Sequence, residues 1–281
     1  MTPPLPLDGR IALVTGASTG IGRVTARELA REGACVFLAC RSEARARPVI
    51  DEIRRLTGRD AAFYLELDLA DSASVRRCAE HFLRRALPLH LLVNNAGLAG
   101  ARGLTRDGFE MAFGVNHLGH FLLTRLLLPR LQASAPARVV TVASKAHVRA
   151  PAVDWEALRR PTHSFSGIGE YASSKLANIL FGAELARRLA GSGVASYTLH
   201  PGVVDTEVWR ALPRLLRPLL RLRGLLSPED GARTTLHCAL RAPASESGAY
   251  YDRCRPCLPS AMARDPQLAA ELWRRSEDWM A

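Results

Sequence analysis

Short apolar runs alternate with longer stretches of helical periodicity along most of the chain. The apolar runs occupy residues 11–15, 34–40, 63–67, 89–94, 139–143 and 194–200. Apolar positions recur with helical spacing in 24–30, 43–56, 72–85, 107–132, 171–190 and 267–279. Strands that alternate with helices predict βαβ units, and strands without polar alternation predict a mainly parallel sheet covered on both faces. We expect one α/β domain over residues 1–281, with a loose segment at 1–8.

Composition and charge narrow the class of protein. Hydrophobic residues make up 48% and charged residues 23%, which are ordinary globular values. The net charge is +11, and Lys145 and Lys175 are the only lysines among 38 basic residues. We interpret this charge as an arginine-rich solvated surface, with a phosphate-bearing ligand or an anionic membrane as the alternatives. The sequence contains no recognisable nucleic-acid-binding module.

Targeting signals and metal-binding patterns are also absent from the sequence. No apolar run approaches the ~20 residues of a membrane span, and the N-terminal residues lack a signal-peptide pattern. Six cysteines are present, but the Cys254–Cys257 spacing has no second Cys or His pair nearby, so we expect no metal site. These observations predict a cytoplasmic protein in a reducing compartment.

A glycine-rich turn follows the first apolar run. The motif runs from Gly16 to Gly22 and also contains Ser18, Thr19, Gly20 and Ile21. Glycines let backbone N–H groups approach a ligand closely, and the following helix would offer its N-terminus to a pyrophosphate. Its G-x-x-x-G-x-G spacing departs from the standard dinucleotide fingerprint, so a plain strand–helix connection is the alternative interpretation.

Arg41 stands at the end of the second apolar run, where a carboxylate would bind the ribose diol of NAD. A guanidinium can instead pair bidentately with a 2′-phosphate. The sequence therefore favours NADP(H) over NAD(H), with a solvated strand-end arginine as the alternative.

Tyr171 and Lys175 lie one helical turn apart in 171–190, so they share a helix face. A nearby ammonium favours the phenolate, which lets the pair exchange a proton with an alcohol or carbonyl. Alone, this spacing is common by chance. Small polar residues also follow the strands predicted to end at the same sheet edge, where ligands bind in open α/β sheets. These residues are Asn94 to Gly97, Ser144, and Pro201-Gly202 leading to Thr206. Asn116 lies in a largely apolar helical stretch, where asparagine is disfavoured.

Together, and in this order, these motifs resemble the short-chain dehydrogenase/reductase family over roughly residues 9–252. The resemblance implies a Rossmann-type doubly wound sheet of about seven strands. It implies that Tyr171 is the general acid/base, that Lys175 lowers the pKa of Tyr171 and holds the nicotinamide ribose, and that Ser144 orients the carbonyl oxygen. Asn116 would support a proton-relay water. The remaining implied cofactor contacts are Asp68 and Leu69 near the adenine, Asn94, Ala96 and Gly97 along the cofactor, and Pro201, Gly202, Val204 and Thr206 near the nicotinamide.

Within this family the sequence looks like the retinol dehydrogenase branch. The features that carry this resemblance are Ala39-Cys-Arg41, Val115-Asn-His-Leu-Gly-His120, Ala146-His147 after Ser144, the Tyr171–Phe181 segment, and the separation of Ser144 from Tyr171 (171 − 144 = 27). The branch implies a lipophilic substrate: retinal-like, steroid-like or an aliphatic aldehyde or ketone. Many animal members begin with a hydrophobic anchor, and the sequence here lacks one, which weighs against retinoids.

Residues 204–226 interleave leucines with arginines and contain Pro213 and Pro218. They could form a lid over a lipophilic substrate, a peripheral membrane contact through 209–226, or an ordinary packed helix pair. Trp155 and Phe165 could line the pocket, and Trp273 and Trp279 could pack internally or form a homo-oligomer contact.

The histidines at 117, 120, 147 and 200 are interpreted as structural, because Tyr–Lys chemistry requires none of them. Two other functions remain open. A sugar-nucleotide epimerase also carries the Tyr–Lys spacing, but Asn94 to Gly97 and the lack of a large C-terminal substrate domain argue against it. A catalytically idle nucleotide-binding sensor or scaffold is the second, and the intact Ser144, Tyr171 and Lys175 argue against that one.

Overall fold

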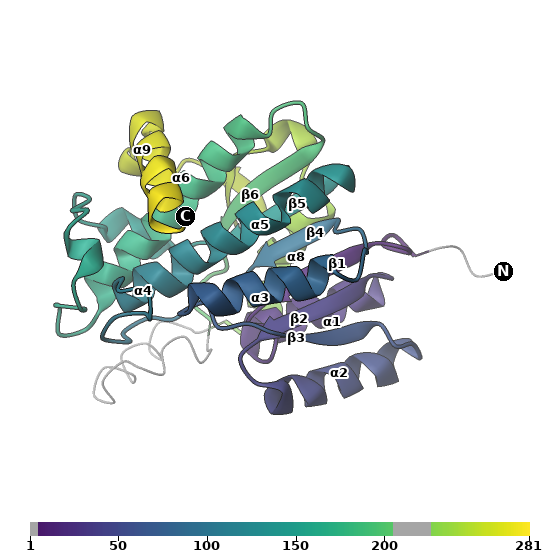
Figure 1. Ribbon diagram of the computed structural model, residues 1–281. Coiled ribbons are helices and arrows are strands. Elements are labelled where there is room, and N and C mark those ends of the chain that lie inside the picture. Colours follow the sequence, from purple (N-terminus) through teal and green to yellow (C-terminus); the bar gives the residue numbers. More distant parts are fainter. Residues whose placement is uncertain (1–4, 205–225) are drawn as a thin grey trace.

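The computed structural model describes residues 5–204 and 226–281. Within this part of the chain, eight strands form one sheet in the order β3-β2-β1-β4-β5-β6-β7-β8 (Figure 1). Strands β1 to β7 pair in parallel, and β8 pairs with β7 in the antiparallel sense. The strand bounds are β1 Ile11–Thr15, β2 Cys35–Cys40, β3 Ala62–Glu66, β4 Leu91–Asn94, β5 Ala137–Val142, β6 Val194–His200, β7 Tyr250–Asp252 and β8 Arg255–Cys257. The predicted α/β class with about seven mainly parallel strands is confirmed.

Helices cover both faces of the sheet and separate the core into two halves. One half contains residues of α1 (Gly20–Arg31), α2 (Glu43–Thr57) and α8 (Pro228–Leu240). The other contains residues of α3 (Ser72–Leu83), α5 (Gly119–Ala133), α6 (Ile168–Arg188) and α9 (Pro266–Trp279). Successive strand residues alternate between the halves: Leu13 belongs to the second and Val14 to the first. The central strands therefore bury both faces, which explains their continuous apolar runs.

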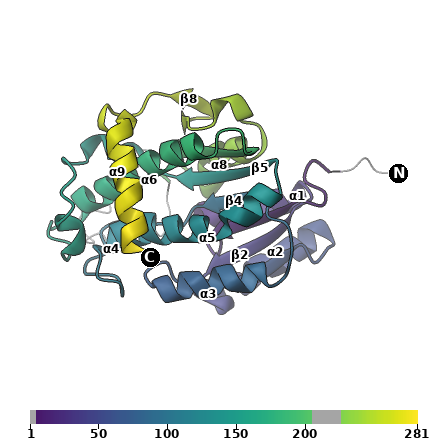
Figure 2. The same ribbon diagram turned by 45° about the horizontal axis from the view of Figure 1, so that its top comes forward.

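Helix α9 lies outside α5 and α6 rather than against the sheet (Figure 2). Its Trp273 is buried, stacks on Phe181 of α6 at a ring-centroid distance of 5.8 Å and meets Phe121 of α5 edge-on at 5.1 Å. The C-terminal end reaches α3, where Arg76 donates to the carbonyl oxygen of Met280 at 2.5 Å. The expectation that Trp273 packs internally fits this placement.

Three local features differ from the sequence-based prediction. Strand β8 was not expected, because its residues are all exposed and show no apolar pattern. It follows a tight turn in which Arg253 and Cys254 both have left-handed φ values, +50° and +60°, without a glycine. The helical stretch 107–132 is divided into α4 (Met111–Phe113), a π-helix (Gly114–Leu118) and α5. The described part of the segment predicted to be loose is attached to α1, since Leu7 N–H donates to the carbonyl of Glu32 at 2.8 Å.

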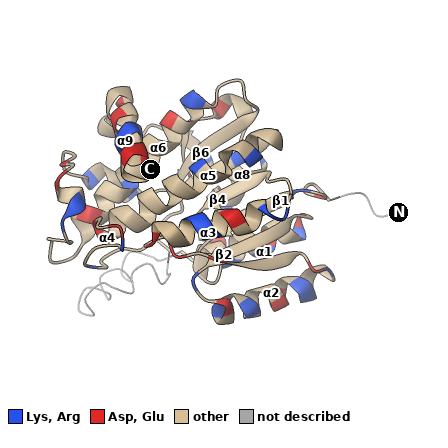
Figure 3. Cartoon of the chain, in the orientation of Figure 1, with Lys and Arg blue, Asp and Glu red and all other residues tan. Residues whose placement is uncertain are grey.

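Charged residues of both signs are dispersed along the described chain, including along α2 and α9 (Figure 3). Many arginines are paired within helices, such as Arg47 with Glu43 at 3.1 Å and Arg274 with Asp278 at 2.9 Å. Across residues 5–204 and 226–281, no helix is both long enough and apolar enough to span a bilayer.

Candidate active site

The carboxyl ends of four neighbouring strands bring the sequence-predicted motifs to one edge of the sheet. Strands β1, β4, β5 and β6 are adjacent and parallel, so the segments that follow them start side by side. These segments contain the glycine turn, Asn94 to Gly97, Ser144 and Pro201-Gly202. In open α/β sheets this edge is where ligands bind.

The glycine turn is packed so closely that side chains would not fit. Gly16 has a φ of +65°, and an added Cβ would lie 2.9 Å from the Cα of Ala96. At Gly22 an added Cβ would lie 2.4 Å from both Asn95 Nδ2 and the carbonyl oxygen of Gly16. Helix α1 begins at Gly20 without a side-chain cap from Thr19. Its first N–H groups therefore face the turn without a side-chain acceptor, as an anion-binding turn requires.

Thr15 connects this turn to the segment after β4. Its Oγ1 accepts the N–H groups of Asn95 and Ala96, each at 2.9 Å, while Asn95 Nδ2 donates to the Thr15 carbonyl at 2.8 Å. The side chain of Asn94, a residue expected along the cofactor, is fully buried and donates from Nδ2 to Thr124 Oγ1 at 3.0 Å. Asn95, which the sequence analysis included in the motif without assigning it a role, holds the two segments together.

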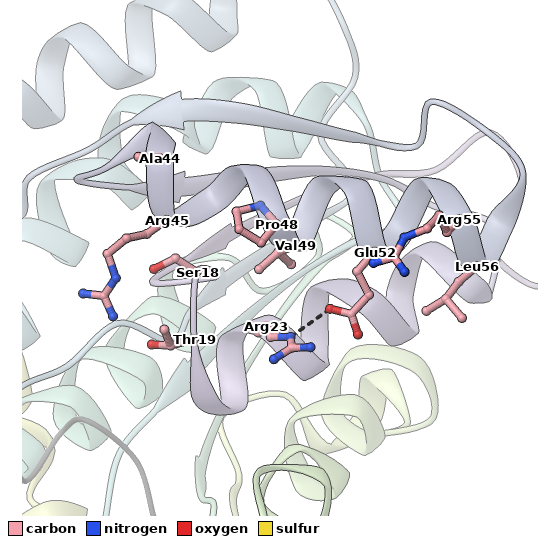
Figure 4. Close-up of a pocket in the computed structure, with 10 residues that line it drawn as sticks. All are labelled: Ser18, Thr19, Arg23, Ala44, Arg45, Pro48, Val49, Glu52, Arg55 and Leu56. Atoms are coloured by element: carbon pink, nitrogen blue, oxygen red, sulfur yellow. Dashed lines mark hydrogen bonds and ion pairs between the residues drawn. The ribbon is translucent and has the colours of Figure 1, made fainter.

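A groove of about 740 Å³ lies between the glycine turn and α2 (Figure 4). Ser18 and Thr19 line one end, and the side chain of Arg45 extends beside them from the first turn of α2. Arg41 is exposed at the end of β2 and has no hydrogen bond or ion pair within the part of the chain that the structure describes. The sequence analysis missed Arg45, although a basic residue in the first turn after the second strand was the available signal.

Asp68 and Leu69 follow β3, the strand that pairs with β2 at one edge of the sheet. The half-buried Asp68 accepts the N–H of Ala70 at 3.0 Å, which fixes its carboxylate locally. Leu69 is buried and packs against Gly119, where an added Cβ would lie 2.9 Å from the leucine Cβ. Leu69 therefore supports α5 with its side chain.

Tyr171 and Lys175 lie on the buried face of α6, at 5% and 3% exposure. Lys175 Nζ donates to the carbonyl of Val142 at 2.9 Å and stands 5.7 Å from the centroid of the Tyr171 ring. Asn178, one turn further on, donates to the same carbonyl at 3.1 Å. Helix α6 is thereby fixed to the end of β5, with its phenol and ammonium groups next to each other.

Ser144 follows β5 and is hydrogen-bonded to Tyr171. Its Oγ accepts the N–H of Ala146 at 3.1 Å and begins the 3₁₀ helix Lys145–Arg149. The Nδ1–H of His147 donates to the Ser144 carbonyl at 2.7 Å, and its Nε2 accepts the N–H of Ser260 at 3.1 Å. The serine is thus held on both its side-chain and main-chain oxygens.

Burial shifts the pKa values of this pair away from the charged forms. It raises the pKa of Tyr171 above its ordinary value, and the hydrogen bond with Ser144 partly opposes that shift. Burial also lowers the pKa of Lys175 to about 7. We expected Lys175 to lower the pKa of Tyr171, but here burial is the larger effect on the phenol. Tyr171 is therefore held mainly as a neutral acid.

Asn116 lies in the π-helix, buried, and joins three segments. Its Oδ1 accepts the N–H of Leu98 at 2.9 Å, while its Nδ2 donates to the Leu98 carbonyl at 3.0 Å and to Ser174 Oγ on α6 at 2.9 Å. An added Cβ at Gly97 would lie 3.4 Å from Lys175 Nζ and 3.5 Å from Asn116 Oδ1. Gly97, Asn116 and Lys175 are thus brought together, and single-turn π-helices are frequent at functional sites.

The segment after β6 returns toward the glycine turn. Gly202 has a φ of +91°, which favours glycine, and Pro201 is half-buried beside it. An added Cβ at Gly231 of α8 would lie 2.6 Å from Val204 and 3.1 Å from Ile21, so both side chains pack on α8. Thr206 and nearly all of the predicted lid and membrane segment lie outside the described residues.

Trp155 and Phe165 were both expected to line the substrate pocket, and the structure places them in different surroundings. Phe165 is 80% exposed. Trp155 contributes to a cavity of about 290 Å³ on the outward side of α6, together with Leu176, Leu180 and Leu272. Neither Tyr171 nor Ser144 lines this cavity, so Trp155 packs near α9 and away from the Tyr–Lys pair.

The match to known families agrees with this arrangement. A family model for short chain dehydrogenases matches residues 10–156. The chain is 44% identical to retinol dehydrogenase 12 of Mus musculus, covering 98% of this chain and 87% of the relative. It belongs to the short-chain dehydrogenase family and is an oxidoreductase of that class.

The particular branch follows from the nature of the relatives. Polyprenol dehydrogenase of Mus musculus is 48% identical, covering 96% of this chain and 83% of that protein. A solved Escherichia coli CFT073 structure complexed with NADPH is 27% identical, with a TM-score of 0.71, covering 89% of this chain and 99% of that one. The high identity to retinol dehydrogenase 12 over nearly the whole chain places this protein in the retinol dehydrogenase branch.

Proposed function

We propose that this protein interconverts a lipophilic carbonyl compound and its alcohol with NADP(H), and that Tyr171 is the acid/base. The observation that carries the proposal is the buried Tyr171, hydrogen-bonded to Ser144 and beside Lys175, at the sheet edge that also holds the glycine turn. When bound, NADPH supplies a hydride to the carbonyl carbon. The protein's own residues then have to bind the carbonyl oxygen and deliver one proton to it.

The proton comes from the hydroxyl of Tyr171 in the reductive direction. Because burial raises the pKa of Tyr171, the phenol is protonated at neutral pH and ready to donate. Ser144 Oγ orients the substrate oxygen beside the phenol. After transfer the phenolate would be stabilised by the Lys175 ammonium, whose position the Val142 carbonyl fixes.

Preference for NADP(H) over NAD(H) is supported by cations at the groove beside the glycine turn. Arg41 has no carboxylate partner among the described residues, and Arg45 extends beside Ser18 and Thr19 (Figure 4). Two guanidinium groups can bind a 2′-phosphate through charge-assisted hydrogen bonds. The NADPH in the Escherichia coli relative's structure is consistent with this preference.

The lipophilic substrate class is supported by the relatives. Retinol and polyprenol, which appear in the names of two of them, are both long apolar alcohols. Exposed apolar side chains in the segments after β5 and β4, Phe165, Val148 and Leu104, are consistent with an apolar entrance.

The proposal is tested by NADPH oxidation with retinal, steroid ketones, aliphatic aldehydes and quinones, each repeated with NADH. We expect turnover with at least one apolar carbonyl, a lower KM for NADPH than for NADH, and no turnover in Tyr171→Phe. NADPH binding without turnover across the panel would overturn the enzymatic proposal in favour of a nucleotide-binding sensor. Equal KM values for NADPH and NADH would overturn the cofactor preference alone.

A further inference from the structure

His120 occupies a position between the nucleotide turn and the π-helix. It lies on the first turn of α5 and is 1% exposed. Its Nδ1 is 3.0 Å from the main-chain carbonyl oxygen of Asn116, and its Nε2 is 2.8 Å from Thr15 Oγ1. One ring therefore contacts both the residue that joins the glycine turn to the segment after β4 and the residue at the centre of the π-helix.

The partners determine which nitrogen carries the hydrogen. A carbonyl oxygen only accepts, so His120 Nδ1 must be the donor to Asn116. Thr15 Oγ1 already accepts two N–H groups, from Asn95 and Ala96, so its own hydrogen is available for a third partner. The nearer acceptor is His120 Nε2 at 2.8 Å, compared with the Val93 carbonyl at 3.4 Å. The ring is therefore neutral, and burial lowers its pKa to about 4, which agrees with that state.

We propose that His120 is a positioning residue that couples cofactor binding to the catalytic segment. Its ring fixes the distance between Thr15, which organises the cofactor-binding turn, and the main chain of Asn116, whose side chain contacts Leu98 and Ser174. The π-helix changes the pattern of backbone hydrogen bonds at this point, and the His120 side chain supplies a hydrogen bond to the main-chain carbonyl of Asn116. This inference rests on the proposed function and adds a role for a residue interpreted above as structural.

Two substitutions separate the two contacts of the ring. In His120→Asn the shorter amide can take the place of Nδ1 and keep the contact to Asn116, but it does not reach Thr15. In His120→Gln the longer amide can take the place of Nε2 and keep Thr15, but it loses Asn116. One lost buried hydrogen bond corresponds to about a tenfold change in the affected constant.

We expect a crossed result from these variants. The dissociation constant for NADPH, from fluorescence titration, should rise about tenfold in His120→Asn, while kcat at saturating NADPH stays near the parent value. In His120→Gln, kcat should fall about tenfold while the dissociation constant stays near the parent value. General destabilisation of the protein would change the dissociation constant and kcat together within each variant. The proposal would be overturned if the two variants showed the same changes in these constants, or if neither variant showed a change.

His90→Ala is the matched control. His90 also bonds to the main chain, accepting the Ile11 N–H at 3.0 Å, but it immediately precedes β4, at the opposite edge of the sheet. Both constants should remain at the parent values in this variant. If the dissociation constant or kcat of His90→Ala changed as much as in the His120 variants, the loss of any histidine contact would have the same effect, and the proposal would be overturned.

A measurement that needs no turnover keeps the inference separate from the proposed function. NADPH binding should slow amide hydrogen exchange in residues 114–118 of the parent protein, and Thr15→Val should abolish that slowing while Thr15→Ser retains it. Unchanged exchange on NADPH binding, or the same slowing in Thr15→Val, would overturn the coupling even if the His120 variants do not fold. Absence of turnover in the parent would overturn only the proposed function.

Discussion

Mild acid should destabilise this protein strongly, because four histidines, at positions 117, 120, 147 and 200, are buried and burial lowers the pKa of each. Burial lowers the pKa of His117 to about 3 and the pKa values of His120 and His200 to about 4, from an ordinary value of 6.5. The unfolded chain therefore binds more protons than the folded protein between about pH 6.5 and pH 4. The stability contributed by these groups is present above pH 6.5 and is lost as the pH falls.

The size of the effect follows from the distance between the working pH and the unfolded-state pKa. A pH of 5 is about 1.5 units below the pKa of a histidine in the unfolded chain. Each pH unit changes the free energy of unfolding by about 1.4 kcal/mol per histidine. Each of His117, His120 and His200 therefore removes about 2 kcal/mol, and together they remove about 6 kcal/mol. The lowered pKa of His147 acts in the same direction. The pKa of buried Glu110 is raised, which acts in the opposite direction and reduces this total. A loss of that order is comparable with the whole stability of a typical domain, about 5–15 kcal/mol.

Equilibrium urea unfolding at pH 7, 6 and 5, followed by tryptophan fluorescence, measures this loss directly. The free energy of unfolding should fall by several kcal/mol, and His120→Asn should reduce that fall by about 2 kcal/mol, because one titrating group is removed. A change smaller than about 2 kcal/mol between pH 7 and pH 5 would refute the assignment of neutral buried histidines.

Further predictions concern single side chains. Tyr171→Phe should abolish turnover but leave the NADPH dissociation constant near the parent value, and residual turnover above about 1% would exclude Tyr171 as the sole proton donor. Lys175→Ala should impair both kcat and NADPH binding, which steady-state kinetics and titration can separate; loss of one alone would contradict its double role. Arg41→Asp should raise the KM for NADPH at least about tenfold and favour NADH, and an unchanged ratio would remove the argument for the 2′-phosphate. Trp273→Ala should lower the free energy of unfolding by about 3–5 kcal/mol, measured by urea denaturation, because the indole is buried against α5 and α6.

The sheet could be predicted because its strands are buried on both faces. Segments such as Ile11–Thr15 and Val194–His200 are fully buried, and their apolar runs coincide with the observed strands. Strand β8 could not be predicted in this way, since its residues are exposed and pair through the backbone alone. The π-helix could not be predicted either. It differs from an α-helix in which carbonyl each N–H group binds, and the spacing of apolar residues does not indicate that partner.

The site could be predicted as far as its motifs depend on residue type and spacing. Tyr171, Lys175 and Ser144 come together as expected, because α6 and the end of β5 are joined through the Val142 carbonyl. The direction of the Tyr171 pKa shift could not be predicted, since it depends on how deeply the phenol is buried. The role of Asn95 could not be predicted, because it acts through contacts with Thr15, which is distant in sequence.

The position of α9 means that the last residues of the chain cover the outer side of the helix that carries Tyr171 and Lys175. Trp273 stacks on Phe181, which belongs to the same helix as Tyr171 and Lys175. A variant truncated after residue 265 would expose this aromatic side of α6 to water. The protein would then have an exposed hydrophobic patch prone to aggregation, while the Tyr171–Lys175 pair itself would remain in place. Purification tags are therefore better attached at the N-terminus, away from the contact between Met280 and Arg76.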